Sequence, residues 1–277
     1  MIDKNKKSET KGFVARSEGS LAANVTPPPL RLDGVTLAAR LRCLVEIRTG
    51  RGKKSGWLTA NDRGCLEFIG EQGTVTIDQL WRSLLSAEKK TRSLRHLYRR
   101  VEFWQEQGLV QSFTEPGSKR LYLKLTRRAV SAVSTLSIKQ LPFPAPPKSE
   151  LAHTLALTEF RLAAVALGKV ARWVSDRSLR TDSSFPTRLG NYCPDAYWVT
   201  PSGRRIFLEY ERTRKTKARR REKYEHFARE MGRADKSMDM VVWIADGACL
   251  EMLESIVRIA PNQKVFSTQS FFAELGR

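Results

Sequence analysis

Residues 194–211 have the sequence PDAYWVTPSGRRIFLEYE, in which two apolar runs can pair as neighbouring strands. Side chains alternate between the faces of a strand, so Phe207, Glu209 and Glu211 share one face of the second run. Hairpin pairing would bring Asp195, at the start of the first run, beside Glu209. Two carboxylates on one face of an apolar strand are costly unless a positive charge lies near them.

Two interpretations of these acids are open. Three oxygen ligands converging at strand ends suit Mg²⁺ or Mn²⁺, and such a metal can polarise a phosphodiester. We therefore take Asp195, Glu209 and Glu211 as candidate metal ligands. Alternatively, the acids form structural ion pairs with basic residues that follow closely in the sequence, namely Arg212, Arg214 and Lys215.

The flanking segments predict an α/β domain over residues 150–277. A helical pattern at 153–170 precedes probable strands near 171–174, 193–199 and 206–211. A long basic helix, an apolar strand at 240–245 and a helix at 248–259 follow. The predicted order is therefore a helix, three strands, a helix and a further strand, which is typical of an α/β domain.

The segment 212–223 contains eight Lys and Arg residues and one acid. Like charges repel on a helix, so this segment favours a polyanion beside it, and Arg212, Arg214 and Lys217 are candidate DNA contacts. An ordinary solvated helix is the alternative. Tyr224, within the same helix, could attack phosphorus, although packing is the commoner role of such a tyrosine.

A second domain is predicted over residues 57–140. Asn61 or Asp62 can cap a first helix, Thr76 caps a second, and a third covers about 91–107. Two alternating apolar runs around the turn TEPGSK, residues 114–119, then predict a hairpin. Three helices followed by a hairpin are typical of a winged helix-turn-helix, whose third helix enters the major groove.

The third helix carries an apolar stripe at Leu94, Leu97, Val101 and Trp104. Its first ten residues, 91–100, contain arginines and no acid. Such a face suits phosphates and guanine edges, unless the domain binds another protein. The candidate DNA contacts in this domain are Arg92, Arg95, Arg99 and Arg100 on the helix, and Lys119 and Arg120 at the hairpin tip.

The composition of the chain indicates the kind of partner that it binds and the compartment in which it functions. The chain has 277 residues with 49 Lys+Arg and 29 Asp+Glu, a formal charge of +20. This excess favours nucleic acid over an anionic membrane. The four cysteines and three histidines are isolated, which predicts reduced thiols and no zinc site. The first residues lack the apolar core of a secretion signal, and no apolar run reaches membrane-spanning length, so we expect a cytoplasmic protein without membrane insertion.

Two segments lie outside the predicted domains. Residues 1–55 form a basic, largely flexible arm with one helical pattern at Val35–Ile47. Residues 141–149 contain four prolines and predict a stiff linker.

The pattern P-D-x(13)-E-Y-E, followed by R-T-R-K and a basic helix with K-Y-E, resembles the replication–relaxation family. It is most similar to the MobC-type relaxases of mobilisable plasmids. The resemblance implies a winged helix joined to a restriction-endonuclease-like PD-(D/E)xK domain. The implied activity is metal-dependent nicking of one DNA strand at a plasmid transfer origin. A coupling protein or an accessory relaxosome protein is an implied partner.

Under this resemblance Asp195, Glu209 and Glu211 match the acidic motif and would bind Mg²⁺ or Mn²⁺. Glu211 stands where the general nuclease pattern has lysine, and Lys215 or Lys217 from the next segment can replace it. The predicted catalytic set is therefore Asp195, Glu209, Glu211 and Lys215. Glu159, on the preceding helix, stands where such folds often supply another carboxylate. The alternative function is a non-catalytic relaxosome accessory protein or a transcriptional regulator; an ordinary restriction enzyme is less favoured.

Overall fold

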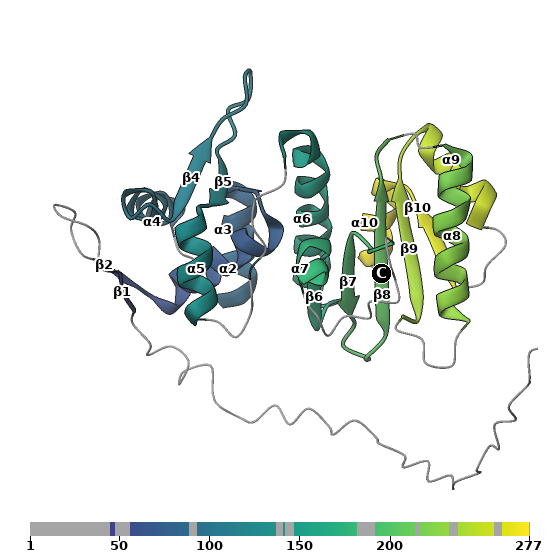
Figure 1. Ribbon diagram of the computed structural model, residues 1–277, viewed down its shortest axis with the longest axis horizontal. Helices are drawn as coiled ribbons and strands as arrows, with labels where there is room; N and C mark the ends of the chain where they lie inside the picture. Colours follow the sequence, from purple (N-terminus) through teal and green to yellow (C-terminus); the bar gives the residue numbers. More distant parts are fainter. Residues whose placement is uncertain are drawn as a thin grey trace, which may run out of the picture. The chain divides into compact units, whose positions relative to one another are not determined.

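A computed structural model describes residues 45–47, 56–88, 93–136, 141, 147–181, 192–213, 216–232, 238–257 and 262–276 (Figure 1). Nearly all of the predicted basic arm and most of the predicted linker lie outside these ranges. Val45–Ile47, predicted to end a helix, instead form strand β1, which pairs antiparallel with β2, Gly56–Leu58. None of the described helices has the length and apolarity to cross a membrane.

The N-terminal part consists of helices and a small antiparallel sheet of order β3-β5-β4. Its elements are α2 (Ala60–Gln72), β3 (Val75–Thr76), α3 (Ile77–Glu88), α4 (Leu94–Glu106), β4 (Val110–Phe113), β5 (Tyr122–Leu125) and α5 (Arg127–Leu136). The three predicted helices and the predicted hairpin are present. Helix α5 and strand β3 were not predicted.

Side-chain caps fix where the helices of this part begin. Thr59 caps α2: its hydroxyl accepts from the Asp62 N–H, and the Asp62 carboxylate accepts from the Thr59 N–H. The predicted caps Asn61 and Asp62 were therefore wrong, because Asp62 occupies the third helical position of this capping box. Thr76 caps α3 as predicted, with Gln79 as its reciprocal partner.

One apolar core holds these helices to the small sheet. Leu97, Val101 and Trp104 of α4 are buried in it, as their spacing predicted. Leu94 is 42% exposed, so its predicted place in the buried stripe was wrong. It is the first residue of α4.

The C-terminal part contains a five-stranded mixed sheet of order β10-β9-β8-β7-β6. β6 (Arg172–Ser175), β7 (Ala196–Val199) and β8 (Arg205–Glu211) are antiparallel neighbours. β9 (Met240–Ala245) and β10 (Gln263–Phe266) continue the sheet in parallel. The helices are α6 (Leu151–Ala166, preceded by a 3₁₀ turn at Lys148–Glu150), α7 (Asp176–Thr181), α8 (Lys217–Met231), α9 (Ala248–Val257) and α10 (Thr268–Leu275).

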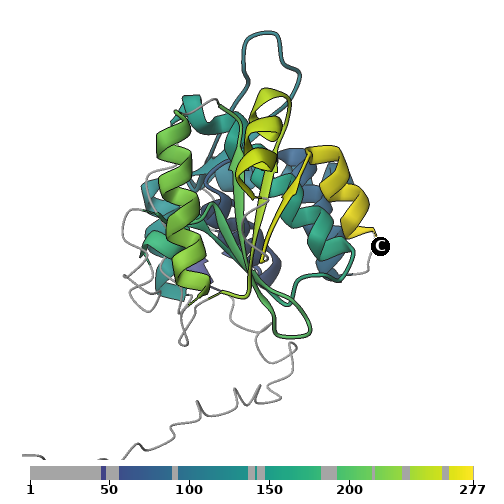
Figure 2. The ribbon, with the colours of Figure 1, turned by 90° about the vertical axis from the view of Figure 1, so that its right-hand side faces the viewer.

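Helices cover both faces of this sheet (Figure 2). One face packs against α6 and α10 through residues such as Leu208, Phe160 and Phe271. The other packs against α8 and α9 through residues such as Phe207 and Phe227. The predicted α/β order from α6 to α9 is confirmed, whereas α7, β10 and α10 were not predicted. Cys65, Cys193 and Cys249 are free thiols, as expected.

Candidate functional site

The pairing of β7 with β8 brings the two predicted acids together. Ala196 lies opposite Leu208, so Asp195, one residue earlier, enters β7 beside Glu209. Oδ2 of Asp195 accepts a hydrogen bond of 2.8 Å from the backbone N–H of Tyr210. The hairpin register, set by the alternating apolar residues, thus fixes the Asp195 carboxylate at the carboxyl end of β8.

Glu209 is fully buried and paired with a lysine from α8. Its side chain is 1% exposed, and its Oε2 accepts a hydrogen bond from Nζ of Lys223. Oε1 is also buried and has no hydrogen-bond partner among the described residues. Burial raises the pKa of Glu209 to about 8, and the negative charges of Asp195 and Glu211 add to this, although Lys223 opposes it. Burial alone would lower the pKa of Lys223, but Glu209 and Asp195 outweigh it and raise that pKa.

Asp195 also contacts a histidine from α6. Nε2 of His153 lies 3.4 Å from Oδ1 of Asp195, and the imidazole stacks on Tyr210 with ring centroids 5.5 Å apart. Burial would raise the pKa of Asp195, but the hydrogen bond with His153 and the charge of Lys223 outweigh it, so that pKa is lowered. Burial would lower the pKa of His153, but the hydrogen bond with Asp195 and the charge of Asp195 outweigh it, so that pKa is raised. Asp195 is therefore held ionised between Lys223 and the imidazole of His153.

A cavity of about 280 Å³ opens beside Asp195. His153, Asp176, Arg177 and Arg180 also line it. Burial raises the pKa of Asp176, and the charge of Asp195 contributes. The cavity therefore presents carboxylates and guanidinium groups together, a lining suited to a phosphate and its counter-charge.

Glu211 is buried close to Glu209, but the three predicted acids are not assembled into a ready three-ligand site. It is 2% exposed and lies close enough to raise the pKa of Glu209 through its charge. However, no group of three Asp, Glu, His or Cys side chains in the described ranges is arranged to hold a metal ion. The buried, unpartnered Oε1 of Glu209 and the neighbouring Asp195 carboxylate are oxygen donors of the kind that divalent cations prefer. A metal at this point stays a prediction.

Sequence reasoning missed Lys223 as the basic partner of the acids. Lys215, the predicted catalytic lysine, and Arg214 lie outside the described residues. The missed signal was helical periodicity in α8: Arg220, Tyr224, Phe227 and Met231 are all buried and recur at spacings of three and four. Lys223 falls on the same stripe, so the stripe places it towards the sheet. Tyr224 packs in the core, which leaves its alternative role as a nucleophile without support.

The surface of α8 is less uniformly basic than the sequence predicted. Arg220 is buried, and its guanidinium donates to the carbonyl of Thr213 at 2.9 Å and to Sγ of Cys249 at 3.4 Å. Arg219 and Arg221 are exposed, and Arg221 pairs with Glu225 on the next turn. Arg212, just before α8, is exposed. Lys217 begins the helix, but its side chain is outside the described set.

The candidate DNA contacts of the N-terminal part divide into two groups. Arg95 and Arg99 of α4 are exposed, as are Lys119 and Arg120 in the β4–β5 connection. Arg100 instead donates from Nε and Nη2 to the buried carboxylate of Asp62. This guanidinium therefore holds α4 to α2. Arg92 lies outside the described residues.

The model of a known family, described as replication-relaxation, matches residues 66–242. The chain belongs to the replication-relaxation family. No curated protein and no solved structure matches it. The match runs from α2 into β9, so it contains the Asp195–Glu209–Lys223 cluster and the exposed arginines of α4 in one continuous family segment.

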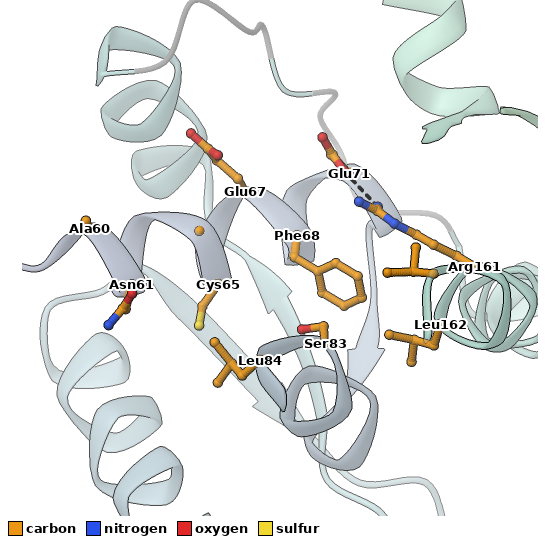
Figure 3. A pocket seen from close by; sticks show the side chains of 12 residues that line it. Ala60, Asn61, Cys65, Glu67, Phe68, Glu71, Ser83, Leu84, Arg161 and Leu162 are labelled. Atoms are coloured by element: carbon orange, nitrogen blue, oxygen red, sulfur yellow. Dashed lines mark hydrogen bonds and ion pairs between the residues drawn. The ribbon is translucent and has the colours of Figure 1, made fainter. Parts of the chain in front are cut away.

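In this replication-relaxation protein α6 connects the acidic cluster to the N-terminal helices. His153, near its start, contacts Asp195, whereas Glu159 accepts hydrogen bonds from Arg82 and Gln79 of α3. Glu159, considered from sequence as a further carboxylate of the site, therefore belongs to the α3–α6 contact. Arg161 reaches Glu71 of α2 at 2.7 Å, across a cavity lined by Phe68 and Leu162 (Figure 3).

Proposed function

We propose that the protein is a metal-dependent endonuclease that nicks one DNA strand at a plasmid transfer origin. Membership of the replication-relaxation family supports a role in plasmid replication or mobilisation. The observation that carries the nuclease assignment is the cluster of Asp195, Glu209 and Lys223 at the end of one strand pair. Buried charges of this kind are rare outside functional sites or structural ion pairs.

The N-terminal part supports DNA recognition by a winged helix-turn-helix. Helix α4 would enter the major groove, with Arg95 and Arg99 facing DNA, and the β4–β5 connection would place Lys119 and Arg120 against phosphates. Arg212 and the exposed arginines of α8 would add phosphate contacts near the acids. The formal charge of +20 supports a polyanionic partner.

The acidic cluster supports the chemistry as follows. Asp195 and Glu209 would hold Mg²⁺ or Mn²⁺, which, when bound, polarises a phosphodiester for attack. Lys223 compensates the buried charge of Glu209 and keeps its side chain oriented. Arg177 and Arg180, in the cavity beside Asp195, would orient the phosphate. We propose Glu211 as a supporting negative charge, and a coupling or accessory relaxosome protein as the partner.

The test is nicking of supercoiled plasmid carrying the cognate origin. The protein should produce open circles with Mg²⁺ or Mn²⁺, and EDTA should abolish them. Glu209→Gln should reduce the rate by at least about 100-fold, because it removes a ligand charge. Glu225→Gln, which changes an exposed acid of α8, is the matched control and should nick normally. Normal nicking by Glu209→Gln would contradict the assignment.

A second candidate is a non-catalytic DNA-binding protein, either a relaxosome accessory protein or a transcriptional regulator. Two observations favour it. Lys223 is paired with Glu209, and no three His, Cys, Asp or Glu side chains of the described residues are arranged to hold a metal ion. This protein would bind DNA equally well with EDTA, and no preparation would nick DNA. Metal-dependent nicking that Glu209→Gln removes would exclude it.

A further inference from the structure

A further cavity lies on the face of the five-stranded sheet opposite to the one that Phe207, Glu209 and Glu211 share. It has a volume of about 470 Å³ and is lined by Ile206 and Met240, at the amino ends of β8 and β9, and by Phe266 and Phe271. Glu209 and Glu211 lie at the carboxyl end of β8. At roughly 3.3 Å per residue, five residues of strand separate Ile206 from Glu211 by about 16 Å. The cavity is therefore distinct from the acidic cluster.

A tryptophan in the wall of the cavity carries a buried hydrogen-bond donor without an acceptor. Trp198 lines it and is 3% exposed, and its indole Nε1 has no hydrogen-bond partner in the part of the chain that the structure describes. Trp173 stacks on Trp198 at 5.4 Å with an interplanar angle of 5°, so the indole is held in place. Buried donors are normally paired, because an unpaired one loses its hydration without replacement.

Three cations line the same cavity. Lys169 is half-buried, and Arg204 and Lys264 are exposed. No ion pair joins any of the three to an acidic side chain of the described residues. Glu274 is the one acid in the lining. The cavity therefore combines an apolar interior with a net positive rim.

We propose that this cavity binds an acidic segment of a partner protein, in which a large apolar side chain is flanked by carboxylates. The apolar side chain would fill the interior beside Trp198, and the carboxylates would pair with Arg204, Lys264 and Lys169. Duplex DNA matches the cations but offers no side chain for the apolar interior. The docking surface goes beyond DNA nicking and does not depend on it.

The probe is a synthetic peptide in which Leu-Leu-Phe is flanked on both sides by Asp-Glu pairs. It is titrated into full-length ¹⁵N-labelled protein while the indole N–H resonances are followed. Trp198→Phe assigns the Trp198 resonance by its loss. The expected result is a saturable shift of this resonance. Arg204→Glu combined with Lys264→Glu should weaken binding at least tenfold, since both side chains are exposed and their reversal leaves the core intact.

Three controls make the result decisive. A peptide with Lys in place of every acid, and one with Ala in place of Leu-Leu-Phe, should not shift the resonance. A 12-base-pair duplex should leave it unchanged. No shift with the acidic peptide, unchanged affinity of the double variant, or the same shift with duplex DNA would each overturn the proposal. Plasmid nicking by the double variant is measured in parallel, and the docking proposal expects it to be unchanged.

Discussion

Lys223 and Glu209 determine the charge of the candidate active site. The side chain of Glu209 is 1% exposed and that of Lys223 is 17% exposed, and taking either charge alone out of water would be costly. Their ion pair offsets this cost, and Oε1 of Glu209 is buried without a hydrogen-bond partner among the described residues. A buried pair of this kind is weak evidence for stability.

Glu209 makes stability depend on pH between about 4.5 and 8. Its pKa is about 8 in the folded chain, whereas an exposed glutamate has the ordinary value of 4.5. The folded state thus binds the proton more tightly, and the associated stability is complete below about pH 4.5 and is lost as the pH rises through 8. Lys223, whose pKa is raised, does not titrate in this window.

We expect the melting temperature of Glu209→Gln to lack this dependence on pH. Thermal unfolding of both proteins is followed by circular dichroism from pH 4.5 to 8.5. The wild type should become less stable, relative to the variant, as the pH rises. Parallel curves across the whole range would show that Glu209 titrates normally.

Arg100 and Arg99 are adjacent but have different roles. Asp62 is 3% exposed and accepts from Arg100, from the indole of Trp104 at 3.1 Å and from Thr59. Arg100→Ala leaves this buried carboxylate without its cation and should cost about 2–4 kcal/mol of unfolding free energy. Arg99→Ala, at an exposed position, should cost less than about 0.5 kcal/mol. Urea denaturation measures the unfolding free energies of both variants. Equal losses would contradict the different roles assigned to Arg100 and Arg99.

At the scale of elements, α6 contacts the N-terminal helices through two ion pairs of different burial. The Arg161–Glu71 pair is more enclosed than the Arg82–Glu159 pair. Phe68 also lies under the Arg161 guanidinium, 4.9 Å from its ring centroid. Coulombic attraction grows as water is removed, so the enclosed pair should be the stronger.

Double-mutant cycles with alanine test this ranking. We expect a coupling energy of about 1–2 kcal/mol for Arg161 with Glu71 and about 0.5 kcal/mol for Arg82 with Glu159. Unfolding free energies of the two single variants and the double variant supply each cycle. A larger coupling in the exposed pair would reverse the ranking.

The elements also show where sequence reasoning works. The apolar alternation of β8 and the stripe of α4 predict buried faces because each face repeats with the geometry of its own backbone. The α8 segment misled because its charge was counted without its periodicity, so the inward positions of Arg220 and Lys223 were not identified. Their neighbours Tyr224 and Phe227 contained the missing information. Glu159 was misassigned because its partners, Arg82 and Gln79, come from a segment almost 80 residues away.

At the scale of the whole molecule, the excess of positive charge should govern binding to DNA. Each phosphate contact adds about one unit to the slope of log affinity against log salt. Arg95→Ala combined with Arg99→Ala should therefore reduce that slope by about two. Fluorescence anisotropy with a labelled duplex between 50 and 250 mM KCl measures it. An unchanged slope would remove α4 from the DNA-contact surface.

The overall plan could be predicted from sequence more fully than the site. The order of helices and strands is local information, and the segments from α2 to α9 follow it closely. The three-dimensional partners of Asp195 are not local: His153 and Lys223 come from helices on opposite faces of the sheet. Only packing brings them together. The metal, the nicking activity and the partner stay predictions.

Helix α6 contributes Leu162 to the core of the N-terminal part and Phe160 to that of the sheet. One helix therefore completes two hydrophobic interiors, and neither half is a self-contained module. An exchange of N-terminal halves between relatives would succeed only if both faces of this helix matched their new neighbours. The sequence of α6 is thereby constrained by two cores at once.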